Sequence, residues 1–513
     1  MTSSGLASAL EEFLVGSSNA IVIEDGAVTF DFAQTKYSVS GENNKCLLHL
    51  WSPERNVVRR VLELETRGET LRITVQKIGQ ARPSKLEICR EPDPRTAQVK
   101  RAARLAYRRV LERALRKHFA DFAIFQLSTS MDLEKSFGPI YTRGLIKRGQ
   151  SAFAVLGVNR GELQSSIDAA LTFGILWLDA CRQLHAGKLV VEGLKLFVPH
   201  GCSEVVRARI AHLNSALAKW QLYELEERSE ELKRIEFADR GNISTRLVHC
   251  VDETEAFTRF EAPIALVRTL MPEVEVAIIS PAEVSFRCYG LEFARARLAA
   301  RPGHLLGEPE IVFGVGPAER TLEGQNFPQF ERLVRSIGEV RHPDGPSDNK
   351  WWRLHPERWL ESLVTKNICA LDDQFDPRWR YSQVPAFSGS DRGMIDVLTL
   401  TRAGRLAVIE LKADEDVHLP LQGIDYWSRV VWHHARGEFQ KFGYFDGYAL
   451  SSQAPLLVMA APALHVHPAT DALLRYISPE IEWSLLGIDE RWRKQVRVVF
   501  RKRGIRSLLK TAV

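Results

Sequence analysis

The stretch from Gly393 to Tyr426 constrains the fold of this chain more than any other. Apolar and β-branched residues from Met394 to Leu400 predict one strand, and Ala403-Gly404 supplies a turn. Leu406 to Lys412 predicts a second strand that runs back along the first. We therefore expect a β-hairpin here.

Three charged side chains gather at one end of this hairpin. Side chains alternate across a strand, so Glu410 and Lys412 share a face, while Leu411 points the other way into the core. Asp396 lies in the partner strand, where ordinary hairpin pairing brings it beside Glu410. Two converging carboxylates are costly unless something neutralises them, and a divalent cation would do so.

This arrangement resembles the PD-(D/E)XK nuclease superfamily, in which an acid on one strand and an E-x-K on the next hold magnesium for phosphodiester hydrolysis. Asp396 matches the first acid, and Glu410-Leu411-Lys412 matches the E-x-K. The resemblance is closest to RecB-like and archaeal NucS-like nuclease domains, and it covers residues 351–513. It implies a restriction-endonuclease-like α/β domain with a mixed sheet.

Two predicted helices flank the hairpin and extend the resemblance. Pro356 to Ile368 predicts an amphipathic helix, in which Glu361 matches the family's helical carboxylate and Glu357 is the alternative. Gln422 and Tyr426 are four residues apart, so they share one face of a second helix. This is the Q-x-x-x-Y spacing of RecB-like members.

The resemblance also implies a role for each matched residue. Asp396, Glu410 and the carbonyl of Leu411 would hold Mg²⁺ (or Mn²⁺), which prefers oxygen ligands. Lys412 would position a water molecule or stabilise the transition state. Glu361 would reach the metal through water or hold a second ion. Gln422 and Tyr426 would orient Lys412 or the nucleic-acid backbone.

Length and composition set the context for this domain. A chain of 513 residues is too long for one core, and its formal net charge of +5 permits a polyanionic partner without requiring one. Its seven cysteines are scattered without a C-x-x-C pair, which argues against a zinc ribbon or an iron–sulfur cluster. No signal peptide or membrane-spanning run is evident, so we expect a cytoplasmic prokaryotic protein without membrane association.

Four regions are predicted along the chain, which makes it a multidomain α/β protein. Residues 1–94 should form a small antiparallel β domain, because short runs of alternating apolar residues follow one another there. Residues 95–340 read as one α/β module of unknown function that begins with a basic helix. Residues 341–350 are rich in Pro, Gly, Asp and Ser and read as a linker. Residues 351–513 form the nuclease-like domain.

Two basic segments are candidates for contact with nucleic acid. In the helix predicted from Ala97 to Phe119, every charged residue except Glu112 is basic. The tail from Arg491 to Arg506 interleaves basic residues with aromatic ones. The arginines selected as phosphate contacts are Arg101, Arg104, Arg108, Arg109, Arg113, Arg497 and Arg501. A solvated helix face and a charged edge strand are the alternatives.

The middle of the chain contains one imitation of the E-x-K motif. Glu192-Gly-Leu-Lys195 has one residue too many, which places Glu192 and Lys195 on opposite strand faces. We do not predict a second active site there, although a degenerate nuclease-like fold in this part stays open. No internal repeat is evident in the sequence.

The sequence therefore predicts a metal-dependent nuclease whose N-terminal region recognises substrate or a partner, with DNA favoured over RNA by the resemblance. One alternative is a nuclease-like protein that binds nucleic acid or acts as a scaffold without cutting. Another is a nuclease gated by a ligand or protein partner that contacts the N-terminal region.

Overall fold

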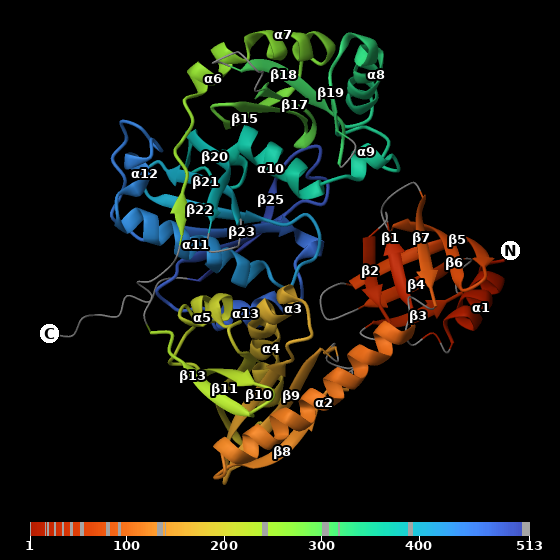
Figure 1. Ribbon diagram of the computed structural model, residues 1–513, viewed down its shortest axis with the longest axis vertical. Helices are drawn as coiled ribbons and strands as arrows, with labels where there is room; N and C mark the ends of the chain where they lie inside the picture. Colours follow the sequence, from red (N-terminus) through yellow and green to blue (C-terminus); the bar gives the residue numbers. More distant parts are fainter. Residues whose placement is uncertain are drawn as a thin grey trace.

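The structure is a computed structural model (Figure 1). It describes residues 2–15, 17, 20–24, 27–32, 35–41, 45–51, 56–77, 83–90, 94–130, 137–138, 140–238, 245–299, 307–316, 319–387 and 393–504. Residues 94–102 are described by their backbone alone. The described strands form four sheets, each with its own order.

The N-terminal unit is a seven-stranded antiparallel sheet with the strand order β2-β1-β7-β6-β5-β4-β3. Helix α1 packs against β3, β4 and β5 and buries Leu10 in the core between them. The elements are α1 (Ser3–Leu14), β1 (Ile21–Glu24), β2 (Ala27–Asp31), β3 (Lys36–Ser40), β4 (Cys46–Trp51), β5 (Asn56–Arg67), β6 (Thr70–Lys77) and β7 (Pro83–Cys89). The predicted antiparallel character of this region is confirmed.

The second unit, called here the β8–β13 unit, is a six-stranded mixed sheet with helices on both faces. Strands β10, β11 and β12 are parallel, and the outer pairs are antiparallel. Its elements are α2 (Pro94–His118), β8 (Ala123–Ser128), β9 (Tyr141–Arg148), β10 (Ser151–Val158), α3 (Gln164–Asp168), α4 (Ala170–Leu184), β11 (Val190–Pro199), α5 (Glu204–Ile210), β12 (Lys219–Glu226) and β13 (Glu231–Ile235).

The third unit, the β15–β19 unit, is a five-stranded antiparallel sheet beside three helices. Its elements are α6 (Glu253–Arg259), α7 (Glu261–Leu270), β15 (Glu275–Ser280), β16 (Glu283–Cys288), β17 (Leu291–Ala299), β18 (Glu308–Phe313), β19 (Arg320–Thr321), η1 (Gly324–Asn326) and α8 (Phe327–Gly338). Residues 95–340, expected to form one module, thus contain two separate sheets.

The C-terminal unit, the β20–β25 unit, has a mixed sheet as predicted. Strands β22, β23 and β24 are parallel, and the remaining pairs are antiparallel. Its elements are α9 (Lys350–Arg353), α10 (Pro356–Lys366), η2 (Ile368–Ala370), β20 (Phe375–Phe387), β21 (Met394–Thr401), β22 (Leu406–Leu411), α11 (Leu419–Ala435), α12 (Glu438–Lys441), β23 (Leu456–Pro462), η3 (Ala463–His465), α13 (Thr470–Arg475), β24 (Trp483–Ile488) and β25 (Val498–Gly504). The short strand β14 (Arg246–Leu247) pairs with β20, so this sheet begins before residue 351.

The segment expected to be a linker begins with a residue that is locked in place. Arg341 is fully buried, and its guanidinium donates hydrogen bonds to the carbonyls of Cys288 and Tyr289 at 2.8 Å. It also donates to the carbonyls of Trp351 at 2.6 Å and Leu354 at 2.8 Å. The composition of this segment predicts flexibility, but Arg341 ties the β15–β19 unit to the start of the β20–β25 unit.

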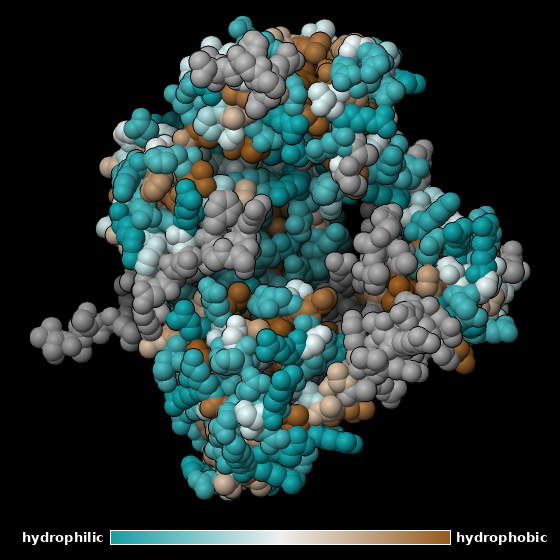
Figure 2. Space-filling view, in the orientation of Figure 1, coloured by the Kyte–Doolittle hydropathy of each residue, from teal (hydrophilic) through white to brown (hydrophobic). Residues whose placement is uncertain are grey.

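The C-terminal unit lies between two of the other three units (Figure 1). The β15–β19 unit lies on one side of it and the β8–β13 unit on the other, while α2 leads from the N-terminal unit into the β8–β13 unit. The face seen in Figure 2 is mostly hydrophilic, and its hydrophobic residues gather in small patches. Among the described residues, no helix is both long enough and apolar enough to cross a membrane.

Candidate functional site

The predicted hairpin is present and brings its acids together. Strands β21 and β22 are antiparallel, and Val397 pairs with Ile409, so Asp396 lies across from Glu410. The backbone N–H of Leu411 donates a hydrogen bond of 2.9 Å to Oδ2 of Asp396. The site therefore forms at the end of β22, where α10 packs on one face of the sheet and α11 on the other.

Glu410 and Lys412 form an ion pair that is almost completely buried. Glu410 is 1% exposed and Lys412 is 8% exposed, and Nζ of Lys412 donates to Oε1 of Glu410 at 3.1 Å. The other carboxylate oxygen of Glu410, Oε2, is buried without a hydrogen-bond partner among the described residues. A buried carboxyl oxygen without a hydrogen-bond partner carries a desolvation cost, which marks it as a place for a ligand.

Burial and charge shift the pKa values of all three groups. Burial raises the pKa of Asp396 to about 6, the Leu411 N–H opposes this, and the charge of Glu361 adds to it. Burial, and then the charge of Asp396, raise the pKa of Glu410 well above its ordinary value. Burial lowers the pKa of Lys412, but the surrounding carboxylates, led by Glu410, outweigh it, so its pKa is raised. Lys412 is thus a permanent cation at neutral pH.

Helix α10 brings Glu361 to the acids, as expected, and one residue that the sequence did not reveal links them. Glu361 is 5% exposed and accepts hydrogen bonds from Arg358 at 2.9 Å and from Nε2 of Gln383 at 2.7 Å. The same amide nitrogen lies 3.4 Å from Oδ1 of Asp396. Glu357, the alternative match, is exposed and lies 3.9 Å from Nζ of Lys412.

Gln383 holds this position in a strained backbone conformation. Its φ is 53°, in the left-handed region that residues other than glycine rarely adopt. It falls in β20 between the pairs formed by Ser382 and Val384, opposite Asp396. Such strain is found at functional sites where the surrounding structure fixes it. No local sequence signal identifies Gln383, because its contacts with Glu361 and Asp396 depend on a strand that the sequence did not predict.

Helix α11 presents the predicted Gln422 and Tyr426 on one face. Burial, and then the charge of Glu410, raise the pKa of Tyr426 to about 12, while a hydrogen bond with Gln422 opposes the shift. Arg429, three residues further on, lies with its guanidinium 5.6 Å from the centre of the Tyr426 ring. The guanidinium of Arg429 also lies against Gly393: a Cβ added to Gly393 would be 2.1 Å from Nη1 of Arg429. The i, i+4, i+7 spacing could have identified Arg429.

The residues present fit a divalent cation. Asp396 and Glu410 offer carboxylate oxygens, one of which has no partner among the residues that the structure describes, and burial makes the ionised form of both acids unfavourable. In the described part of the chain, no three His, Cys, Asp or Glu side chains are grouped as a metal site. A magnesium site of two carboxylates, a carbonyl, waters and a phosphate oxygen does not need three such side chains, so it is compatible with this observation.

The arginines chosen for α2 lie in varied surroundings. Arg104 is 8% exposed and is held by Glu162 at 2.6 Å, so it stabilises the β8–β13 unit from inside. Arg113 pairs with Glu230 at 2.6 Å. Arg108 is partly buried, and Arg109 is exposed. The side chain of Arg101 lies outside the described residues.

The two arginines chosen in the tail are also paired with acids. Arg497 bonds to Asp489 at 2.5 Å, and Arg501 pairs with Asp372 while donating to the carbonyl of Leu371 at 2.8 Å. The sequence pattern could not show these partners, because they lie on other elements of the fold. Of the selected arginines whose side chains are described, Arg109 is therefore the clearest candidate for an external phosphate.

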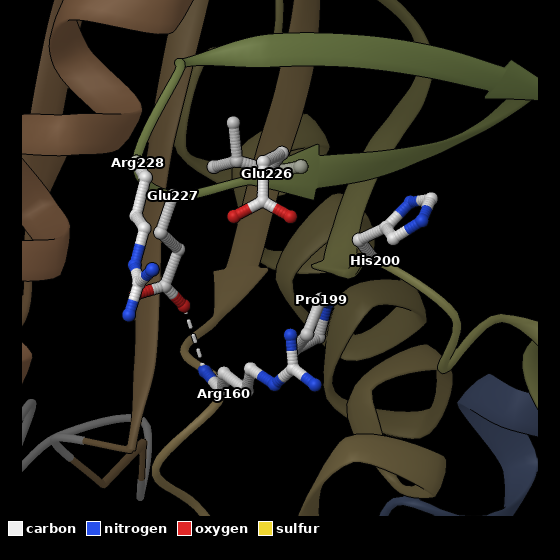
Figure 3. Close-up of a pocket in the computed structure, with 7 residues that line it drawn as sticks. Arg160, Pro199, His200, Glu226, Glu227 and Arg228 are labelled. Atoms are coloured by element: carbon white, nitrogen blue, oxygen red, sulfur yellow. Dashed lines mark hydrogen bonds between the residues drawn. The ribbon is translucent and has the colours of Figure 1, made fainter.

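A separate pocket lies in the β8–β13 unit, at the carboxyl ends of β10, β11 and β12 (Figure 3). Its volume is about 450 Å³, and it carries charges of both signs. The lining residues are Arg160, Pro199, His200, Leu225, Glu226, Glu227 and Arg228. Glu227 accepts the backbone N–H of Arg160 at 2.7 Å, which closes one side of the pocket.

Comparison with known proteins adds no family assignment. No protein-family model matches the chain, and no curated protein matches it either.

Proposed function

We propose that this protein is a metal-dependent nuclease that hydrolyses phosphodiester bonds, with DNA favoured over RNA by the family resemblance. The observation that supports this most is the buried pair of Asp396 and Glu410, in which one Glu410 oxygen beside a buried lysine has no partner within the described part of the chain. A structural ion pair would satisfy its own oxygens, whereas this arrangement leaves one ready for a ligand.

Asp396, Glu410 and the carbonyl of Leu411 would hold Mg²⁺ or Mn²⁺. When bound, the cation lowers the pKa of a water molecule and offsets charge on the phosphate. Gln383 fixes the carboxylates of Asp396 and Glu361 through its side-chain amide. The Leu411 N–H donates a hydrogen bond to Oδ2 of Asp396, so the orientation of this carboxylate is set before substrate binds.

Lys412 and Tyr426 act in their protonated forms. The pKa of Lys412 is raised, so its ammonium serves as a fixed positive charge for a phosphate oxygen and does not act as a base at neutral pH. The pKa of Tyr426 is raised to about 12, so its hydroxyl keeps its proton and can donate a hydrogen bond. The positive charge of Lys412 thus faces the developing negative charge of the phosphate.

The test is cleavage of single- and double-stranded DNA and RNA with Mg²⁺ or Mn²⁺. We expect the double variant Glu410→Gln, Lys412→Met to lose at least about a hundredfold in rate, because it removes a ligand and a fixed charge together. Glu331→Gln is the matched control, since Glu331 pairs with Arg335 on α8, away from the hairpin acids. Cleavage by the double variant at the wild-type rate would refute the proposal.

A nuclease gated by its β15–β19 unit is a second candidate, favoured by a specific contact. Glu275 of β15 bonds to Ser362 and Lys366 of α10, the helix that carries Glu361. Tyr289 packs against Trp359 of α10 with 5.1 Å between ring centres. Under gating, Glu275→Gln should change the cutting rate while leaving the cation affinity unchanged. An unchanged rate would exclude gating through this contact.

A further inference from the structure

The β8–β13 and β20–β25 units have the same fold. In each, a helix precedes three antiparallel strands, a long helix leads to a parallel strand, and a short helix leads to another parallel strand and a final antiparallel one. The sheet orders β8-β9-β10-β11-β12-β13 and β20-β21-β22-β23-β24-β25 correspond strand for strand, with the same directions. We call residues 94–238 the first copy and residues 356–504 the second copy.

The strand registers fix which residues correspond. Strands β11 and β23 both end on a proline, Pro199 and Pro462, which pair with Leu225 and Ile488. Two residues before each proline, Phe197 pairs with Gly157 and Ala460 pairs with Leu411. Gly157 in β10 therefore corresponds to Leu411 in β22.

A short sequence segment agrees with this correspondence. WQLYELEER begins at Trp220 in β12, and WSLLGIDER begins at Trp483 in β24. The register that matches Leu225 with Ile488 also matches the two tryptophans and the final Glu-Arg of each segment. The repeat is therefore present in sequence as well as in topology, although it is too short to be noticed without the structure.

The copies face each other about an approximate two-fold axis. Leu213 and Ile477 form an antiparallel bridge, in which Asn214 N–H donates to the carbonyl of Tyr476 at 2.8 Å. The reciprocal bond joins the Ser478 N–H to the carbonyl of His212 at 2.9 Å. An antiparallel bridge has local two-fold symmetry, so this contact agrees with an axis between the copies.

The helices around this bridge repeat the symmetry. Helix α4 packs on α13, and α5 packs on α11. Arg209 of α5 pairs with Asp425 of α11 at 2.7 Å, and Arg475 of α13 pairs with Asp179 of α4 at 3.0 Å. One continuous hydrophobic cluster includes residues of both copies. The two copies within the chain are thus related to each other like the subunits of a two-fold symmetric dimer.

In the described residues, the first copy lacks the three charged groups that meet at the end of the second copy's hairpin, those of Asp396, Glu410 and Lys412. At the positions of Glu410 and Lys412 it has Leu156 and Val158, both fully buried. Opposite Leu156 is Arg143, in the place of Asp396, and its guanidinium donates to the carbonyl of Ser130 at 2.7 Å. Where the second copy has acids for a cation, the first has apolar side chains and an arginine turned to a carbonyl.

We propose that the chain is an internal dimer with one cutting and one non-cutting copy, so that it cuts one strand of a duplex per encounter. This inference rests on the proposed function for its cutting step. In that step a water oxygen bonds to phosphorus, the bond from phosphorus to one sugar oxygen breaks, and that oxygen takes up a proton. With one set of acids, the second strand of the duplex meets no matching group.

The first experiment measures the conversion of supercoiled circular DNA to nicked and linear forms by the full-length chain with Mn²⁺. The second measures how many Mn²⁺ ions bind to wild type and to Glu410→Gln. We expect nicked circles to accumulate first, with linear molecules only after many nicks, at a rate per molecule that does not rise with protein concentration. We also expect the Mn²⁺ binding of wild type to be lost in Glu410→Gln. Both results would support the proposal.

The other outcomes separate this inference from the proposed function. Linear DNA appearing as early as nicked circles, or a Mn²⁺ site that persists in Glu410→Gln, would overturn the single-site inference while nuclease activity stands. No cutting, with Mn²⁺ binding that depends on Glu410, would overturn the nuclease proposal and leave the division into one cation-holding copy and one cation-free copy. No Mn²⁺ binding and no cutting would overturn both.

Discussion

At the end of β10 the first copy buries Leu156 and Val158, whereas at the end of β22 the second copy buries Glu410 and Lys412. The strand order, the strand directions and the covering helices are the same in both. Burying an apolar side chain stabilises a fold by about 1.5–3 kcal/mol, whereas each buried ion costs several kcal/mol before its partner compensates. The fold therefore does not need the charges.

This difference indicates what the charges are for. The first copy shows that the sheet closes well around apolar residues at these positions, so the second copy keeps its acids at a cost in stability. Such a cost is common at functional sites, where stability and activity compete. Substitutions that make the second copy resemble the first, one group at a time, test whether its charges cost stability.

The largest change in the free energy of unfolding is expected from Lys412→Met. The substitution leaves Glu410 buried without its ion-pair partner, and breaking a buried pair from one side costs about 3–5 kcal/mol. The free energy of unfolding, measured with urea at pH 8 in EDTA, should fall by about this amount. The double variant Glu410→Gln, Lys412→Met should recover most of the loss. A double variant less stable than Lys412→Met would contradict the comparison.

Asp396→Asn should raise the free energy of unfolding, whereas Lys412→Met lowers it. The pKa of Asp396 is about 6 in the folded protein and 3.8 ordinarily, so the folded state holds the proton more tightly. The stability from this group is fully present below pH 3.8 and is lost as the pH rises through 6. Asparagine imitates the protonated form, so the variant should gain about 2–3 kcal/mol at pH 8 in EDTA.

The pH dependence provides the check on this prediction. The gain of Asp396→Asn should shrink as the pH is lowered from 8 toward 4, because the wild-type carboxyl then becomes protonated in the folded state. Urea unfolding of both proteins across this range measures it. A gain that is equal at all pH values, or a loss at pH 8, would contradict the assigned environment of Asp396.

Gln383→Glu should cost about 2 kcal/mol at pH 8, because it replaces an amide donor by a third carboxylate facing Glu361 and Asp396. Gln383→Gly should cost less, since glycine relieves the φ of 53° while the hydrogen bonds are lost. Thermal or urea unfolding of the two variants ranks them. The reverse order would show that Gln383 does not serve to pair the acids.

The two ion pairs of the two-fold contact should contribute unequally to the free energy of unfolding, and the weaker one should give the smallest effect of all. Arg209 is 12% exposed and bonds to both Asp425 and the carbonyl of Asp168, so Arg209→Ala should cost about 1.5–3 kcal/mol. Arg475 is 57% exposed and makes one bond to Asp179, so Arg475→Ala should cost about 0.5 kcal/mol. Equal losses in urea unfolding would show that burial does not distinguish these symmetry-related pairs.

Local pattern was enough to predict the hairpin and its acids. The strands expected from Met394 to Leu400 and from Leu406 to Lys412 are β21 and β22 nearly to the residue. Alternation also placed Glu410 and Lys412 together, because that depends only on the pleat of one strand. Strand β20 was not predicted, since Pro377 and Pro385 interrupt a run that would otherwise be typical of a strand.

Long-range partners could not be predicted in this way. The sequence places Arg104 on a basic helix face, but Glu162, which pairs with it, follows β10. The duplication was hidden because burial requires only that core residues be apolar, so the two copies share a pattern of strands while their sequences differ. The basic composition of α2 and of the tail left both a nucleic-acid surface and a solvated charged face open, because the acids that pair with these arginines lie elsewhere in the sequence.

The most direct test of the central account is anomalous diffraction from crystals of the full chain grown with Mn²⁺. We expect a manganese peak within bonding distance of the carboxylate oxygens of Asp396 and Glu410, and none beside Leu156 and Val158 in the first copy. A peak confined to other residues, with Glu410 Oε2 still unpartnered in a fully ordered site, would show that the buried acids do not hold a cation and would contradict the account.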